Sequence, residues 1–218
     1  GTVALAGMCF TDDGKYVAYA IQDSGSDWQT WKIRDIAADK DLPDVMEHLK
    51  FTAPAWNHDS SGFYYAKYPE PDASEKFTSL NTHMKMMVHK LGTPQSEDTV
   101  IFYQPEHPDW GYNAIVTDDG RYLVVTIWVT TDNKFRIMVQ DLQQPDSKLT
   151  DLIDRFENNY AFVDNDGPIF FFRTDLNAPN GRLIAIDLRN PDRKNWKEII
   201  PESARSEERR VGKECRSR

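Results

Sequence analysis

The chain reads Val116-Thr117-Asp118-Asp119-Gly120-Arg121-Tyr122-Leu123-Val124-Val125 near its middle. An aspartate can cap a tight turn through its own backbone, and a glycine adopts the positive φ that such a turn requires. The aromatic and β-branched residues that follow favour an extended strand. This stretch therefore predicts a β-hairpin that opens onto a well-packed strand.

The same pattern occurs three more times, at residues 10–19, 56–65 and 163–172. The glycines of the four copies are 48, 58 and 47 residues apart, and they are Gly14, Gly62, Gly120 and Gly167. A second partly alternating apolar stretch follows each copy, at residues 28–36, 84–91, 135–142 and 181–188. One unit thus reads strand, turn, strand, loop, strand, and a polar connection to a fourth strand.

Repeats of about 40 to 50 residues built from turn-linked strands are typical of β-propeller blades. We therefore predict an all-β fold, a partial β-propeller of about four four-stranded antiparallel blades over residues 1–204. Aspartate-glycine turns are also common in β-sandwiches, but two markers that recur in step favour the propeller. Residues 196–202 are expected to begin a further unit without completing it, so that the chain is expected to be a piece of a larger ring.

The charge and the cysteines limit the function classes. A net charge of −9 and a pI of about 5.0 argue against nucleic acid as a partner, because phosphate binding requires a positive field. No run of 18 apolar residues occurs, so we expect no membrane-spanning helix. The two cysteines, Cys9 and Cys215, lie at opposite ends of the chain and favour a reducing compartment over a disulfide framework.

The last segment, residues 205–218, has one strongly apolar residue, Val211, and no strand periodicity. Its sequence resembles the in-frame translation of a sequencing-library adapter. A charged disordered tail has the same composition. We expect this segment to be disordered, and we assign it no part in the fold.

The chain lacks the motifs of the common catalytic sites. A serine hydrolase nucleophile of the Gly-x-Ser-x-Gly type is absent, and no glycine-rich phosphate loop occurs. His58 and Asp59 are adjacent, but neighbouring turn residues point apart, so we interpret them as turn chemistry and expect no metal site. The sequence predicts no catalytic residue and no cofactor. We assign the histidines to surface or strand-edge positions: His48, His58, His83, His89 and His107.

Several stretches, in collinear order, resemble the propeller domain of the prolyl oligopeptidase family. They are Gly25-Ser26-Asp27-Trp28, Asp41-Leu42-Pro43-Asp44-Val45, Lys50-Phe51, Ala55-Trp56, Gly62-Phe63-Tyr64-Tyr65, Tyr68-Pro69 and Leu91-Gly92-Thr93-Pro94-Gln95-Ser96-Glu97-Asp98. The resemblance implies a cytoplasmic serine peptidase that cuts short peptides after proline. It also implies a seven-bladed parent ring, of which this chain would be roughly blades two to five, and an α/β-hydrolase domain that this chain lacks.

The resemblance places one residue against substrate. Phe51 would lie on the propeller face that meets the hydrolase domain and would contact the peptide upstream of the proline. The alternative is that Phe51 is a core residue of its blade. Gly111 and Thr131 stand where some relatives have larger or thiol side chains, which leaves the shape of the pocket open. We assign Trp56, Tyr64, Phe170 and Phe171 to blade packing, and His89 and Lys85 to solvated polar positions.

Two other functions remain open at this point. A non-enzymatic propeller scaffold for protein binding would share the fold, although the Gly-His…Trp-Asp signature of such repeats is absent. The propeller of a related oligopeptidase B or dipeptidyl peptidase would share the architecture with a different specificity.

Overall fold

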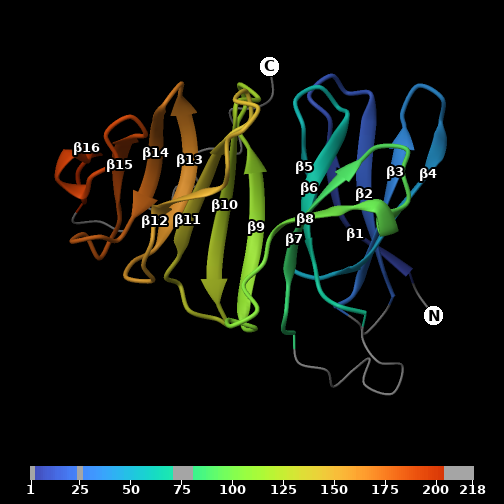
Figure 1. The fold of residues 1–218 in the computed structure, drawn as a ribbon, viewed down its shortest axis with the longest axis horizontal. Helices are drawn as coiled ribbons and strands as arrows, with labels where there is room; N and C mark the ends of the chain where they lie inside the picture. The colour runs from blue at the N-terminus through green and yellow to red at the C-terminus, as the bar shows by residue number, and fades with distance from the viewer. Residues whose placement is uncertain (1–2, 24–26, 71–80, 204–218) are drawn as a thin grey trace.

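The computed structural model describes residues 3–23, 27–70 and 81–203. Within these ranges sixteen β-strands form four antiparallel sheets of four strands, accompanied by two short 3-10 helices. Figure 1 shows the sheets side by side in chain order, from blade 1 in blue to blade 4 in red. The prediction of an all-β partial propeller with four four-stranded blades is confirmed. Residues 24–26 and the predicted disordered segment 205–218 lie outside the described residues.

Each of the first two blades follows the predicted order of strands. Blade 1 consists of β1 (Val3–Phe10), β2 (Tyr16–Asp23), β3 (Gln29–Asp35) and β4 (Lys40–Leu49). Blade 2 consists of β5 (Ala55–Trp56), β6 (Gly62–Lys67), β7 (Lys85–Lys90) and β8 (Thr99–Phe102), with the 3-10 helix η1 (Gln95–Glu97) before β8.

The last two blades repeat this order. Blade 3 consists of β9 (Trp110–Val116), β10 (Tyr122–Val129), β11 (Arg136–Asp141) and β12 (Thr150–Ile153). Blade 4 consists of β13 (Tyr160–Asp166), β14 (Ile169–Thr174), β15 (Arg182–Asp187) and β16 (Lys197–Ile200), with the 3-10 helix η2 (Arg193–Asn195) before β16.

Three apolar cores hold the four sheets together, one at each junction between neighbouring blades. The packing of strand β10 explains why all but one of its residues are apolar or aromatic. Tyr122 and Val124 enter the core shared with blade 4, whereas Leu123 and Val125 enter the core shared with blade 2. A strand covered on both sides loses the usual alternation of apolar and polar residues.

The first and third hairpin turns are nearly superimposable in their hydrogen bonds. Thr11 Oγ1 donates to Asp13 Oδ1 at 2.7 Å, and Thr117 Oγ1 donates to Asp119 Oδ1 at 2.6 Å. In both turns the same aspartate oxygen accepts the backbone N–H two residues later at 3.0 Å. The glycine after each aspartate has a positive φ, 68° at Gly14 and 67° at Gly120. The predicted role of aspartate and glycine is thus observed directly.

In the second turn the assignment of the glycine was wrong. Ser60, with a φ of 59°, occupies the place that glycine has in the other turns. Gly62 instead begins β6, where a Cβ atom would lie 2.1 Å from the carbonyl oxygen of His89 on β7. Glycine is needed there because the neighbouring backbone comes so close.

The interpretation of the last described residues was also wrong. Residues 197–200 do not begin another unit but form β16, the fourth strand of blade 4, which pairs antiparallel with β15. All four side chains of β16 are exposed, so this strand lacks the apolar alternation that identifies the others.

Candidate functional site

The blades have two ends with different connections. The β1–β2, β5–β6, β9–β10 and β13–β14 hairpin turns lie together at one end, here named the turn end. His58 Nδ1 of the second turn is 3.0 Å from Asp12 Oδ2 of the first, and Asn165 of the fourth donates to Asp119 of the third at 3.0 Å. Because antiparallel strands alternate in direction, the β2–β3, β4–β5, β6–β7, β8–β9 and β10–β11 connections lie at the opposite end, here named the loop end.

Phe51 lies at the loop end, in the connection between β4 and β5. Its side chain is 61% exposed, so the alternative that it belongs to a blade core is wrong. Its neighbours point the other way, since Lys50 is 8% exposed and Thr52 is 7% exposed. Phe51 also has a φ of 60°, a left-handed conformation that is costly for a bulky residue. Strained backbone of this kind is found at functional sites as well as in turns, so the exposed ring makes Phe51 a candidate site residue.

A cluster of aromatic and polar side chains includes Lys50, the residue before Phe51, and joins three loop-end connections. Lys50 Nζ lies 3.9 Å from the ring centroid of Trp28 and donates a hydrogen bond to Asn81 Oδ1 at 2.9 Å. The Trp28 ring meets the Tyr68 ring edge-on at 6.0 Å. Burial lowers the pKa of the Lys50 ammonium, with Asp27 acting in the opposite direction. Burial also raises the pKa of the Tyr68 hydroxyl to about 12.

The structure shows what occupies the space beside Gly111. Gly111 on β9 pairs with Trp128 on β10. A Cβ atom at Gly111 would lie 2.2 Å from Cε2 of Trp128, so the indole occupies the space that a side chain at position 111 would need. Thr131 is exposed in the β10–β11 connection at the same end. The smallest side chain is therefore compensated by the largest one on the neighbouring strand.

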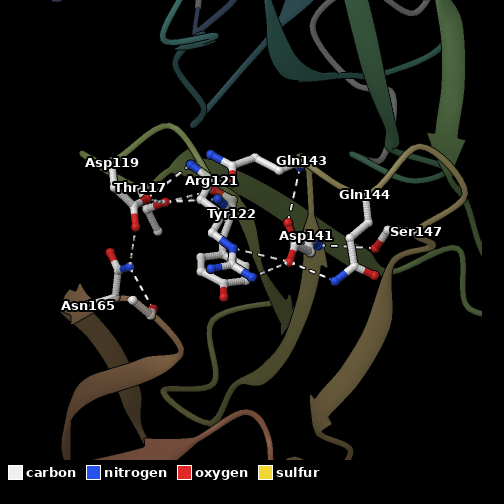
Figure 2. A network of polar contacts seen from close by, with 10 residues as sticks. Thr117, Asp119, Arg121, Tyr122, Asp141, Gln143, Gln144, Ser147 and Asn165 are labelled. Atoms are coloured by element: carbon white, nitrogen blue, oxygen red, sulfur yellow. Dashed lines mark hydrogen bonds and ion pairs between the residues drawn. The ribbon is translucent and has the colours of Figure 1, made fainter.

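The turn end carries a dense polar network, which Figure 2 shows for blades 3 and 4. Arg121 donates to Asp141 Oδ2 at 2.9 and 3.2 Å, and Asn165 links Asp119 to the fourth turn. Burial alone would raise the pKa of Asp119, but hydrogen bonds from Thr117, Arg121 and Asn165 outweigh it and lower that pKa. These contacts hold both carboxylates in ion pairs or turns, so the network stabilises the hairpins and offers no nucleophile.

His89 was wrongly assigned to a solvated position. It is 1% exposed, and its ring lies between two carboxylates, 2.7 Å from Asp98 Oδ1 and 3.0 Å from Asp44 Oδ1. Tyr65 donates to the other oxygen of Asp98 at 2.6 Å. Both aspartates belong to stretches quoted for the family resemblance, residues 41–45 and 91–98, which could have indicated that they act together.

The remaining histidines have ordinary surroundings. His83 Nδ1 contacts Tyr103 Oη at 2.8 Å, and the ring of His107 stacks on Trp110 with centroids 4.3 Å apart. His58 in the second turn contacts Asp12 in the first turn, in agreement with its interpretation as a turn residue. Within residues 3–23, 27–70 and 81–203, no group of three or more histidine, cysteine, aspartate or glutamate side chains could hold a metal ion. In the same ranges no helix has the length and apolarity needed to cross a membrane.

The blade-packing assignments are largely confirmed. Trp56 and Phe170 are buried in the cores of their junctions, and Tyr64 packs against the core between blades 2 and 3. Phe171 is only half-buried. A hollow of about 320 Å³ lies between blades 3 and 4, lined by Tyr160, Arg193 and Trp196 among others, and Phe51 does not line it.

Comparison with known proteins gives the same answer by three routes. Residues 1–214 match the sequence model of the family described as "Prolyl oligopeptidase, N-terminal beta-propeller domain". The chain is 35% identical over 204 residues to the prolyl endopeptidase of Elizabethkingia miricola, with 94% of this chain and 28% of that protein covered. It is 34% identical to prolyl oligopeptidase A of Galerina marginata, with 93% of this chain and 30% of that protein covered.

Solved structures agree with the sequence comparisons. Prolyl oligopeptidase B from Galerina marginata, bound to a 35mer hydrolysis and macrocyclization substrate, superimposes with a TM-score of 0.84 at 29% identity, covering 92% of this chain and 30% of that one. The chain thus spans about 30% of the length of the relatives it matches. By family match, identity and superposition, the chain belongs to the prolyl oligopeptidase family, to its N-terminal β-propeller domain.

Proposed function

We propose that this chain is the propeller part of a serine-type endopeptidase that cleaves short peptides after proline, and that Phe51 contacts the bound peptide. The observation that carries the role of Phe51 is its exposed ring at the loop end, held at a φ of 60° between two buried neighbours. The family match supports the peptidase assignment. The nucleophile, its histidine and its acid would come from an α/β-hydrolase domain that docks on the loop end.

In this proposal the propeller selects substrates by size. A ring of rigid blades around a narrow axis admits a flexible short peptide and excludes a folded protein, and this selection requires no reactive side chain. The three apolar cores between neighbouring blades provide the necessary rigidity. The protein is proposed to act in the cytoplasm, in agreement with the free thiol of Cys9, whose pKa burial raises to about 12.

The experiment uses the intact protein that carries this chain. We expect a ten-residue peptide with one internal proline to be cleaved after that proline, while a folded protein with exposed prolines stays intact. Equal cleavage of both substrates would contradict the size selection. Absence of cleavage after proline would contradict the peptidase assignment itself.

The role of Phe51 has its own test. An aromatic contact worth about 1 kcal/mol corresponds to roughly a fivefold rise in KM for Phe51→Ala, with kcat nearly unchanged. Ile36→Ala is the matched control, because Ile36 is an exposed apolar residue at the turn end. An unchanged KM in Phe51→Ala, or an equal rise in both variants, would show that Phe51 does not contact the peptide.

A further inference from the structure

The strained conformation of Phe51 requires neighbours that hold it. The residue before it, Lys50, is almost fully buried although it carries an ammonium group. Such burial is expensive unless the charge is compensated. We propose that Lys50 is the positioning residue of the loop end: by joining the β2–β3 and β6–β7 connections through its ammonium, it fixes the direction in which Phe51 points. This inference rests on the proposed contact between Phe51 and the peptide.

The contacts of Lys50 reach two different connections. Its ammonium lies over the ring of Trp28, the last residue of the β2–β3 connection, and it donates to Asn81 in the β6–β7 connection. The Trp28 ring also meets His48 and Tyr68 edge-on, at 6.3 and 6.0 Å. Lys50 is thus the point at which three separate segments of the loop end meet.

A second contact fixes the backbone just before Phe51. The N–H of Tyr68 donates to the carbonyl oxygen of His48 at 2.9 Å. His48 and Phe51 both have positive φ, 64° and 60°. The end of β4 and the residue that follows it are therefore tied to the β6–β7 connection twice, through His48 and through Lys50. Phe51 directly follows the second tie, and its exposed ring is presented outward from this fixed point.

The chemistry at Lys50 differs from that of an ordinary buried cation. Its ammonium contacts an aromatic face and a neutral amide directly, while the Asp27 carboxylate, which is among the described residues but makes no ion pair with it, favours its charge only from a longer distance. Cation–π contacts of this kind gain strength when they are desolvated. A methionine at position 50 would fill similar volume, and apolar replacement of a buried charge is often neutral for stability. What the methionine could not supply is the directional hydrogen bond to Asn81.

The test is a double-mutant cycle in the intact protein, with the ten-residue proline peptide as the probe. We expect Lys50→Met to raise KM by about threefold to fivefold with little change in kcat, approaching the effect of Phe51→Ala. In the Phe51→Ala background the same substitution should change KM by less than about 1.5-fold, because residues that act through one contact are not additive. Lys50→Arg keeps a cation that stacks on aromatic rings and should restore KM to within about twofold of the unsubstituted protein.

A third variant covers the case in which Lys50→Met does not fold. Asn81→Ala truncates an exposed side chain and should raise KM in the same direction and with the same dependence on Phe51. If Phe51→Ala raises KM but Lys50→Met has no effect, or an equal effect in both backgrounds, the positioning role is overturned while the proposed function stands. If Phe51→Ala itself leaves KM unchanged, the contact to the peptide fails first, and the two failures are thereby distinguished.

Discussion

Blades 1 and 2 enclose an imidazole between two carboxylates in their shared core, whereas blades 3 and 4 meet through aromatic and aliphatic side chains. At the first junction His89 of β7 contacts Asp44 of β4 in the neighbouring blade, and its ring packs on Phe63 with centroids 4.8 Å apart. At the last junction Tyr122 meets Phe170 edge-on at 5.1 Å. The same blade architecture is therefore stabilised by different interactions at its first junction and at its last junction.

The junction between blades 1 and 2, here named the polar junction, contains further directional contacts between the two blades. The side-chain amide of Gln95 accepts from the backbone N–H of Glu47 at 3.1 Å and donates to its carbonyl oxygen at 3.2 Å, so it extends the edge of β4 as another strand would. Asp44 also accepts from the backbone N–H of Gly92. Blade 2 is thus fastened to blade 1 by directional bonds, in addition to the apolar core around Trp31 and Tyr65.

This difference has a consequence for pH. Burial disfavours the charged form of His89, but the hydrogen bonds to Asp98 and Asp44 outweigh this cost and raise the pKa of His89. With carboxylates at both ring nitrogens, the imidazolium is the form that the site stabilises. Stability at the junction of blades 1 and 2 therefore depends on a proton, whereas the core between blades 3 and 4 depends on shape.

The largest loss of stability is expected at the junction between blades 3 and 4, here named the apolar junction. Phe170→Ala should lower the free energy of unfolding by about 4 kcal/mol, because a fully buried ring is replaced by a cavity. The loss should be the same at pH 6 and pH 8, measured by urea unfolding. Phe171→Ala is the control on the opposite side of the same strand, where the side chain is only half-buried. Equal losses in the two variants would mean that the junction is not tightly packed.

At the polar junction a slightly smaller loss is expected. Asp98→Ala should cost about 3 kcal/mol at pH 6, because His89 and Tyr65 both lose their acceptor in a buried site. Glu97→Ala, one residue earlier and exposed, serves as the control and should leave the urea midpoint unchanged. A neutral or stabilising Asp98→Ala would show that the network contributes nothing to the junction.

The pH dependence separates the two junctions directly. Because the folded-state pKa of His89 is raised, its contribution is fully present below the unfolded-state pKa of about 6.5 and is lost as the pH rises through the folded value. The free energy of unfolding should therefore fall as the pH rises above about 6.5. The decline should persist in Phe170→Ala and largely disappear in Asp98→Ala. Urea titrations should stay below pH 8, since the buried thiol of Cys9 adds a decline of its own once the unfolded thiol ionises.

The repeat pattern was readable from the sequence because its causes are local. A threonine, an aspartate and a glycine within four residues make the turn by bonding to one another, as the first and third turns show. His89 could not be found in this way, because its two carboxylates lie 9 and 45 residues away and meet it only after the blades have packed. Strand β16 was not recognised as the fourth strand of blade 4, because it is defined by its pairing with β15 and not by burial.

The candidate site was also only partly predictable from the sequence. The family resemblance singled out Phe51, but no periodicity could show whether its ring points inward or outward, because it belongs to an irregular connection. Lys50 stands beside it in sequence, yet its importance depends on Trp28 and Asn81, which are 22 and 31 residues away. Contacts between separate connections leave no pattern in a single sequence.

The turns offer the finest comparison, because the first and third turns have the same internal hydrogen bonds but different surroundings above the glycine. Gly14→Ala places a side chain at a φ of 68° with no atom within 4 Å, so only the backbone strain of about 1 kcal/mol is expected. Gly120→Ala has the same strain, but its Cβ atom would lie 2.5 Å from the Cβ of His58, which must move and give up its contact with Asp12. The loss should reach about 2 kcal/mol in urea unfolding, since overpacking adds to strain.

Replacing the neighbour tests this explanation. In a His58→Gly background the clash is removed, so Gly120→Ala should cost no more than Gly14→Ala does. The ion pair between His58 and Asp12 is exposed on both sides and should contribute little by itself. If Gly120→Ala remains the more costly substitution in that background, the second and third turns do not support each other. The packing of neighbouring blades against each other would then depend on the buried cores and not on contacts between their turns.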